Sequence, residues 1–164
     1  MGINKEYRFN FKEYASLGDL SSEYQVLVSE ALDAQKSSYS PYSNFAVGAS
    51  VLLANGEIVQ GSNQENGAFP SGMCAERVAL FYAGSKYPGV AVKAIAITAS
   101  FKGVGPLEPI SPCGACRQVM LETRNIGNTP MEVIMVGERR IYVIDDVTLM
   151  LPFSFFKVDE AIKG

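Results

Sequence analysis

Three cysteines constrain the fold of this chain more than any other feature. They lie in two short segments, residues 71–77 and 111–117, and the 164 residues include no histidine. An odd number of cysteines with a Cys-x-x-Cys pair fits poorly with a disulfide framework. Three thiolates match the protein-ligand count of a catalytic zinc site, whose fourth position stays open for water. The sequence therefore predicts a fold that brings Cys74, Cys113 and Cys116 to one zinc ion per chain.

Both cysteine segments have features of helix N-termini. Pro112 suits a first helical turn, and an apolar stretch with good helix formers, residues 119–121, follows Cys113; the predicted helix that Cys74 opens ends near Gly84. Residues three apart share one face of a helix, so Cys113 and Cys116 can reach the same ion. The partial positive charge at a helix N-terminus favours thiolate over thiol. We therefore expect two helices to begin at the metal.

Two charged residues next to Cys74 complete the predicted chemistry. Three thiolates leave a net negative cluster around Zn²⁺, and Arg77, three residues after Cys74, is the predicted cation that offsets this charge. Glu76 is well located to take a proton from metal-activated water and to pass it to a leaving group. The segment thus indicates hydrolysis, with Glu76 as the proton carrier.

The hydrophobic pattern predicts an α/β domain. Apolar residues at helical spacing follow Ser21 and Ser22, and Asn55-Gly56 predicts a type I′ turn between two strands. The four-residue link 137–140 makes the last two strands antiparallel, because parallel neighbours need a longer crossover. We predict a three-layer α/β/α sandwich with a mixed five-stranded sheet. The predicted strands are residues 45–54, 57–61, 90–99, 132–136 and 141–144.

Residues 1–20 are predicted to form an N-terminal arm in front of a single catalytic domain, residues 21–164. Phe9 and Phe11 alternate as in a short strand, but a docked arm or a contact with a partner explains the pattern equally well. No apolar run approaches the ~20 residues of a membrane span, and the start of the chain lacks a signal-peptide core. We expect a cytoplasmic protein with reduced thiols.

The charge balance favours a small neutral substrate. The net charge is −3 and the pI is near 5.0, and Arg139-Arg140 is the only basic pair. Proteins that bind a phosphate backbone usually carry a basic patch, because much of that affinity is electrostatic. We therefore expect neither nucleic acid nor membrane as a partner.

Four motifs, in order, resemble the zinc-dependent cytidine deaminases, specifically the small homotetrameric branch with three cysteine ligands. The two principal ones are Cys-Ala-Glu-Arg at 74–77 and Pro-Cys-Gly-Ala-Cys-Arg-Gln at 112–118. Asn-Gln-Glu-Asn at 63–66 and Tyr-Ser-Asn-Phe at 42–45 match two further family segments. The resemblance covers residues 21–156 and excludes the arm.

The resemblance implies hydrolytic deamination of cytidine and deoxycytidine to uridine and deoxyuridine, with release of ammonia, in pyrimidine salvage. A zinc-bound hydroxide attacks the base, and Glu76 is the proton shuttle. For substrate binding, the resemblance implies that Asn63 and Glu65 hold the ribose 3′-hydroxyl and that Phe45 lines the base pocket. It further implies that the N–H of Ala75 and the carbonyl of Ser111 orient the base.

The C-terminal segment resembles the family's Leu-Pro-x-x-Phe motif. This implies a homotetramer with shared active sites, in which Phe155 enters a neighbouring subunit's site. Phe153 and Phe156 stand close by, so the sequence leaves open which ring does so, and an apolar plug of the same chain is an equal alternative. An exposed cluster of three phenylalanines favours an interface.

Two other functions remain possible at this stage. One is a zinc deaminase that acts on a nucleoside antibiotic, another base or a nucleotide, which Asn63 and Glu65 disfavour. The other is a zinc-stabilised module without catalysis, which Glu76 disfavours. Metal content together with ammonia release from a panel of substrates separates these alternatives.

Overall fold

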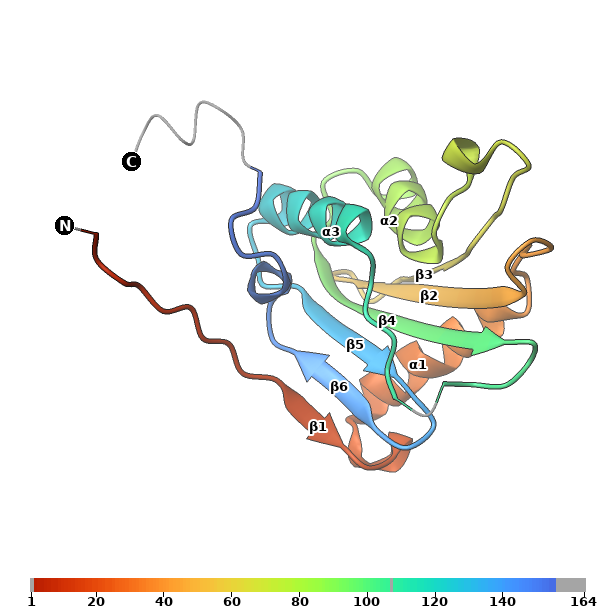
Figure 1. The fold of residues 1–164 in the computed structure, drawn as a ribbon, viewed down its shortest axis with the longest axis horizontal. Helices are drawn as coiled ribbons and strands as arrows, with labels where there is room; N and C mark the ends of the chain where they lie inside the picture. Colours follow the sequence, from red (N-terminus) through yellow and green to blue (C-terminus); the bar gives the residue numbers. More distant parts are fainter. Residues whose placement is uncertain (1, 107, 156–164) are drawn as a thin grey trace.

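A mixed six-stranded sheet forms the centre of the molecule (Figure 1). The structure is a computed structural model that describes residues 2–106 and 108–155. The spatial order is β1-β6-β5-β4-β2-β3, in which only β4 and β5 are parallel neighbours. The strands are β1 (Lys12–Tyr14), β2 (Phe45–Leu53), β3 (Ile58–Ser62), β4 (Val92–Phe101), β5 (Glu132–Val136) and β6 (Ile141–Ile144).

The predicted count of five strands is wrong, because the N-terminal arm supplies a sixth. Strand β1 pairs antiparallel with β6, and Lys12 lies opposite Val143. Phe9 and Phe11 lie outside this strand, in the extended segment that precedes it, and the Phe11 ring packs edge-on against Tyr142 at 4.9 Å between centroids. The arm thus protects an edge of the sheet that its four-residue neighbour β6 would otherwise expose.

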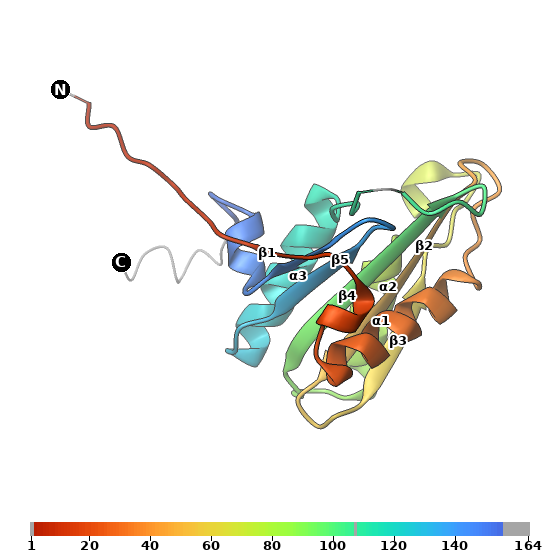
Figure 2. The ribbon, with the colours of Figure 1, turned by 90° about the horizontal axis from the view of Figure 1, so that it is seen from below.

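The structure has three layers, as predicted, and the sheet is the middle one (Figure 2). Helix α1 (Ser22–Gln35) covers one face, and α2 (Ala75–Lys86) and α3 (Gly114–Gly127) lie side by side on the other (Figure 1). Strand β4 shows the reason, because it is buried on both faces: Ile95 and Ile97 pack toward α2 and α3, whereas Ala94 and Ala96 pack toward α1. The small alanines allow α1 to approach the sheet closely.

The β2–β3 hairpin differs in detail from the prediction. A type I′ turn needs a positive φ at both Asn55 and Gly56, but only Gly56 has one, at 86°. The Leu53 N–H donates to the Glu57 carbonyl at 2.9 Å, so three residues form the loop. The glycine is needed, but at the end of a longer loop than the sequence indicated.

The chain after β6 forms a short 3-10 helix, η3 (Val147–Met150), followed by a segment that reaches Phe155. Asp146 accepts a hydrogen bond from the Thr148 N–H at 3.0 Å and caps η3. Phe156 lies outside the described residues. Within residues 2–106 and 108–155, no helix is long and apolar enough to cross a membrane.

Candidate active site

The topology places the N-termini of α2 and α3 at the same end of β4. Helix α2 leads back into β4, and α3 follows β4 through the loop that carries Ser111. Cys74 is the N-cap of α2 and Cys113 is the N-cap of α3, as the sequence predicted for helix starts. Cys116 lies in the first turn of α3 and is fully buried. Two helices that are separated in the chain therefore begin at one point.

The three sulfur atoms form a group that can hold one metal ion. The Sγ atoms of Cys74, Cys113 and Cys116 lie within 4.8 Å of one another, and those of Cys113 and Cys116 are 3.5 Å apart. Tetrahedral zinc with Zn–S bonds of about 2.3 Å needs sulfur atoms about 3.8 Å apart. All three cysteines are free of disulfides. Their spacing and chemistry fit a zinc site that has three protein ligands.

The local charges favour a thiolate at Cys74. A hydrogen bond from Cys116 and the nearby Arg77 lower the pKa of Cys74 to about 5, whereas the contact with Cys74 and burial raise the pKa of Cys116. Arg77 Nη2 lies 3.7 Å from Cys74 Sγ. In the part of the chain that the structure describes, Arg77 Nε is the one buried side-chain polar atom without a hydrogen-bond partner. A partly buried cation beside the thiols fits an anionic cluster that forms when the metal binds.

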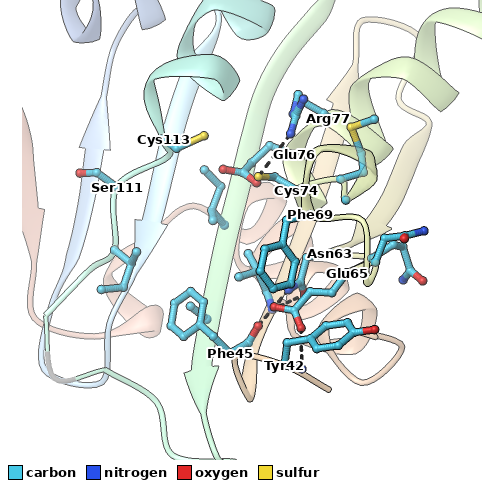
Figure 3. A pocket seen from close by; sticks show the side chains of 18 residues that line it. Tyr42, Phe45, Asn63, Glu65, Phe69, Cys74, Glu76, Arg77, Ser111 and Cys113 are labelled. Carbon is cyan, nitrogen blue, oxygen red and sulfur yellow. Dashed lines mark hydrogen bonds between the residues drawn. The ribbon is translucent and has the colours of Figure 1, made fainter. Parts of the chain in front are cut away.

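Glu76 is a buried carboxyl group at the edge of the sulfur cluster. It is 4% exposed, and this burial raises its pKa. Figure 3 shows its carboxylate extending from α2 into the cavity, beside Cys74 and on the side that faces Cys113. A carboxyl group that faces a cavity from a desolvated position is suited to accept and return a proton.

A cavity of about 490 Å³ connects the sulfur cluster to a polar end formed by the loop after β3. Its walls come from the chain before β2, the loop after β3, β4 and the loop before α3 (Figure 3). Its size is that of a pocket for a small molecule. The residues that line it are Tyr42, Phe45, Val47, Asn63, Gln64, Glu65, Asn66, Phe69, Gly72, Met73, Cys74, Glu76, Arg77, Ile97, Ala99, Ile110, Ser111 and Cys113.

Asn63 and Glu65 lie at the polar end and also hold the surrounding backbone. Asn63 Oδ1 accepts from the Val47 N–H at 2.8 Å, and its Nδ2 donates to the Phe45 carbonyl at 2.9 Å. Glu65 Oε2 accepts from the backbone N–H groups of Tyr42 at 2.9 Å and Ser43 at 3.2 Å. Hydrogen bonds from Ser43 and Tyr42 lower the pKa of Glu65. Glu65 is therefore ionised at neutral pH and fixed in place.

The remaining predicted residues lie at different distances from this cavity. Phe45 lines it, whereas the Ala75 side chain is buried beneath it. The Ala75 N–H belongs to the first helical turn, where N–H groups lack an acceptor within the helix. Phe155 is 77% exposed and does not line the cavity of its own chain. Its predicted place in a neighbouring subunit stays a prediction.

Sequence reasoning missed two residues at the entrance. Phe69 is 74% exposed and packs edge-on against Tyr42, with ring centroids 5.8 Å apart. Tyr42 lies in the motif at 42–45, from which the family resemblance implies a role for Phe45 only. Phe69 stands in a short 3-10 turn, Phe69–Ser71, without periodic pattern, so no local signal marked it.

A fold of this kind, with three convergent thiols and a buried carboxyl group beside them, defines a zinc-dependent hydrolytic enzyme. Residues 21–132 match the model of the cytidine and deoxycytidylate deaminase zinc-binding region. The cytidine deaminase of Sporosarcina psychrophila is 39% identical over 138 residues, which cover 84% of this chain and 94% of that protein. The cytidine deaminase of Halalkalibacterium halodurans is 46% identical over 98 residues, 60% of this chain and 70% of that protein.

Solved structures agree with these relatives. The crystal structure of cytidine deaminase from Burkholderia pseudomallei superposes with a TM-score of 0.68 at 38% identity, over 80% of this chain and 98% of that one. The cytidine deaminase from Mycobacterium tuberculosis gives a TM-score of 0.66 at 30% identity, over 84% and 100%. The chain belongs to the cytidine and deoxycytidylate deaminase family of zinc-dependent enzymes.

Proposed function

We propose that this protein deaminates cytidine and deoxycytidine hydrolytically, giving uridine, deoxyuridine and ammonia in pyrimidine salvage. The observation that carries the proposal is the buried Glu76 carboxyl group, which faces a cavity with the sulfur cluster at one end and Asn63 and Glu65 at the other. The names of the relatives support the same substrate. Three free thiols need a reducing compartment, which supports a cytoplasmic location.

Cys74, Cys113 and Cys116 are the residues that would hold the zinc ion. When bound, zinc lowers the pKa of a water molecule and so makes a nucleophile available at neutral pH. Arg77 offsets the negative charge of the three thiolates, because its guanidinium lies 3.7 Å from Cys74 Sγ. With this offset the site retains enough positive character to activate water.

Glu76 carries the protons of the reaction. It accepts a proton from the attacking water and delivers it to the ring nitrogen next to the reacting carbon. It then accepts the remaining proton of the new hydroxyl group on that carbon and transfers it to the departing amino group. A carbon–oxygen bond forms, the carbon–nitrogen bond breaks, and ammonia leaves. The raised pKa of Glu76 suits a group that must both accept and release a proton near neutral pH.

The polar end of the cavity suits a ribose and disfavours a phosphate. The Glu65 carboxylate, held by two backbone N–H groups, can accept from the 3′-hydroxyl, and Asn63 keeps one amide hydrogen to donate. A phosphate next to an ionised Glu65 would be repelled. Phe45 lies against the base, and the Ser111 carbonyl and the Ala75 N–H orient it. A free nucleoside is therefore the proposed substrate, not a nucleotide or a nucleic acid.

An absorbance assay tests the proposal. Purified protein that contains one zinc ion per chain is expected to convert the ultraviolet spectrum of cytidine, and of deoxycytidine, to that of the uracil nucleoside. Deoxycytidylate is expected to react far more slowly. A chelator should abolish the change, and zinc should restore it. A zinc-loaded protein that leaves both nucleosides unchanged would refute the proposal.

We further propose a homotetramer in which neighbouring subunits share active sites. The support is the exposure of Phe155 and Phe153, whose side chains are 77% and 103% exposed in the part of the chain that the structure describes. Large rings exposed together are typical of an interface. Sedimentation analysis should give a tetramer for the wild type, and Phe155→Ala should weaken both assembly and cytidine binding. A monomer with full activity contradicts this assembly.

A further inference from the structure

Residues 110–112 form a wall between the active-site cavity and a second cavity of about 370 Å³. Ser111 lines both cavities, and the predicted zinc ligand Cys113 follows directly after Pro112. Considering residues 2–106 and 108–155 alone, a single hydrogen bond holds the backbone of this wall: Arg117 Nε donates to the Pro112 carbonyl at 2.9 Å. Arg117 thus supports the segment that presents Ser111 to the active site, and this segment leads into Cys113, whose own carbonyl accepts from the Arg117 backbone N–H at 3.0 Å.

The same guanidinium also holds a distant part of the chain. Arg117 Nη1 donates to the carbonyl of Met150, the last residue of η3, at 3.2 Å. Arg117 therefore bridges two carbonyl groups with donors in one rigid plane. A lysine has the same charge but only one ammonium nitrogen on a flexible stem, so it cannot reproduce this fork.

Arg117 both supports the wall and attaches η3 to α3, whereas a second arginine of α3, Arg124, only attaches η3. Arg124 Nε and Nη2 donate to Asp146 Oδ2 at 3.1 and 3.0 Å, and Asp146 caps η3 at its start. Both arginines therefore attach η3 to α3, one at each end. Of the two, Arg117 alone also contacts the wall, so attachment of η3 and support of the wall can be tested independently.

We propose that Arg117 is a positioning residue for the reaction. By holding the Pro112 carbonyl, it keeps Cys113 within reach of the metal and keeps the Ser111 carbonyl directed at the base. The inference rests on the proposed function for the role of Ser111, but its consequence for Cys113 requires only the metal site. Arg117 does not line the active-site cavity, so it acts through the segment that it holds.

The test compares Arg117→Lys, Arg117→Met and Arg124→Met. In both Arg117 variants we expect the KM for cytidine to rise about tenfold, because the loss of one hydrogen bond from a charged group weakens an affinity by about that factor. The kcat of the zinc-saturated enzyme should stay within about twofold, since the lost orientation affects bound substrate and transition state alike. Zinc transfer to an excess of chelator should be about tenfold faster, because Cys113 is less well held.

Arg124→Met is the matched control. It makes the same change of arginine to methionine as Arg117→Met, but it removes the other attachment of η3, the bonds from Arg124 to Asp146. Its thermal unfolding midpoint should therefore fall. Its KM and its rate of zinc release should match the wild type. The inference is overturned if Arg117→Lys behaves as the wild type, because charge alone then suffices. It is also overturned if Arg124→Met reproduces the Arg117 effects, because attachment of η3 then explains them.

Failure of the proposed function gives a different result. If the wild type never converts cytidine, the KM comparison vanishes, but the rates of zinc release still decide whether Arg117 positions Cys113. Faster release from both Arg117 variants, with wild-type release from Arg124→Met, supports the positioning role in that case also.

Discussion

Glu76 and Arg77 are neighbours in the chain, yet each acts on a different part of the site. Glu76 extends into the cavity, and Arg77 contacts the Cys74 sulfur. Spacing within one helical turn predicted that Arg77 and Cys74 meet, because residues three apart share a face. Spacing could not predict that Asn63 is bonded to the backbone of Val47 and Phe45, since these contacts depend on how β2 and β3 pair.

Glu76→Ala should abolish turnover while the protein keeps its metal. General acid–base catalysis contributes about 10²–10⁴-fold, and we expect kcat to fall by at least about 10²-fold. One zinc ion per chain should remain, because Glu76 is not a ligand. Metal analysis and initial rates measure the two effects. Glu122→Ala, an exposed glutamate on α3, is the control and should be unaffected. Full activity of the Glu76 variant contradicts its role.

Glu65→Gln should distinguish the ribose from the base. The amide keeps an oxygen for the N–H groups of Tyr42 and Ser43 but loses the charge that strengthens a bond from a sugar hydroxyl. We expect the KM for cytidine to rise about tenfold, as the loss of a charge-assisted bond implies. Inhibition by free cytosine should not change. Equal weakening of both ligands would exclude a ribose contact.

Individual elements were predictable where the pattern is local. Strands β5 and β6 end where the sequence indicated, and the short link between them does make them antiparallel, as expected. Strand β1 was missed because three residues with mostly exposed side chains carry no periodic pattern. Its pairing with β6 joins residues at opposite ends of the chain, and a local pattern contains no information about such a contact.

Gly61 allows β3 to lie close to α2, the helix that begins after Cys74. A Cβ at this position would lie 2.6 Å from the Ala75 carbonyl oxygen and 2.5 Å from the Ala79 nitrogen, both in the backbone of α2. Gly61→Ala should therefore lower the free energy of unfolding by about 1–3 kcal/mol, the usual cost of overpacking. It should also weaken zinc binding, because α2 carries Cys74.

Gly84→Ala provides the control within α2. Among residues 2–106 and 108–155, no atom outside the neighbouring residues and backbone of α2 lies within 4 Å of a Cβ built there, so alanine should stabilise the helix by about 0.5–1 kcal/mol. Urea denaturation of the two variants measures both changes. If Gly61→Ala is as stable as the wild type, the close approach of β3 and α2 does not exclude a side chain at residue 61.

At the scale of the whole molecule, the site exists because distant segments meet at one end of β4. The sequence predicted the ligand set and the three layers. It could not predict that Arg117 joins the wall to η3, because Met150 lies 33 residues after Arg117 and a local pattern contains no information about such a contact. The assembly of subunits also depends on contacts outside a single chain, so it remains a proposal.

Removal of zinc should destabilise the entire domain. An ion that binds only the folded state at 1,000 times its Kd adds about 4 kcal/mol, and in a domain of this size each kcal/mol shifts Tm by about 2–4 °C. We expect a chelator to lower Tm by about 8–16 °C, measured by circular dichroism. The Tm of Cys116→Ser, which lacks a ligand, should respond much less. An equal shift in both proteins contradicts a shared metal site.

The placement of the ligands on two helices separated by a central strand also bears on how the protein matures. Cys113 and Cys116 can chelate a metal as soon as α3 forms, but Cys74 joins them only after β4 has inserted between β2 and β5. A chain whose sheet is incomplete therefore lacks the preformed group of three sulfur atoms. Tight capture of the ion is reserved for molecules whose sheet is already complete, so metal retention reports correct folding.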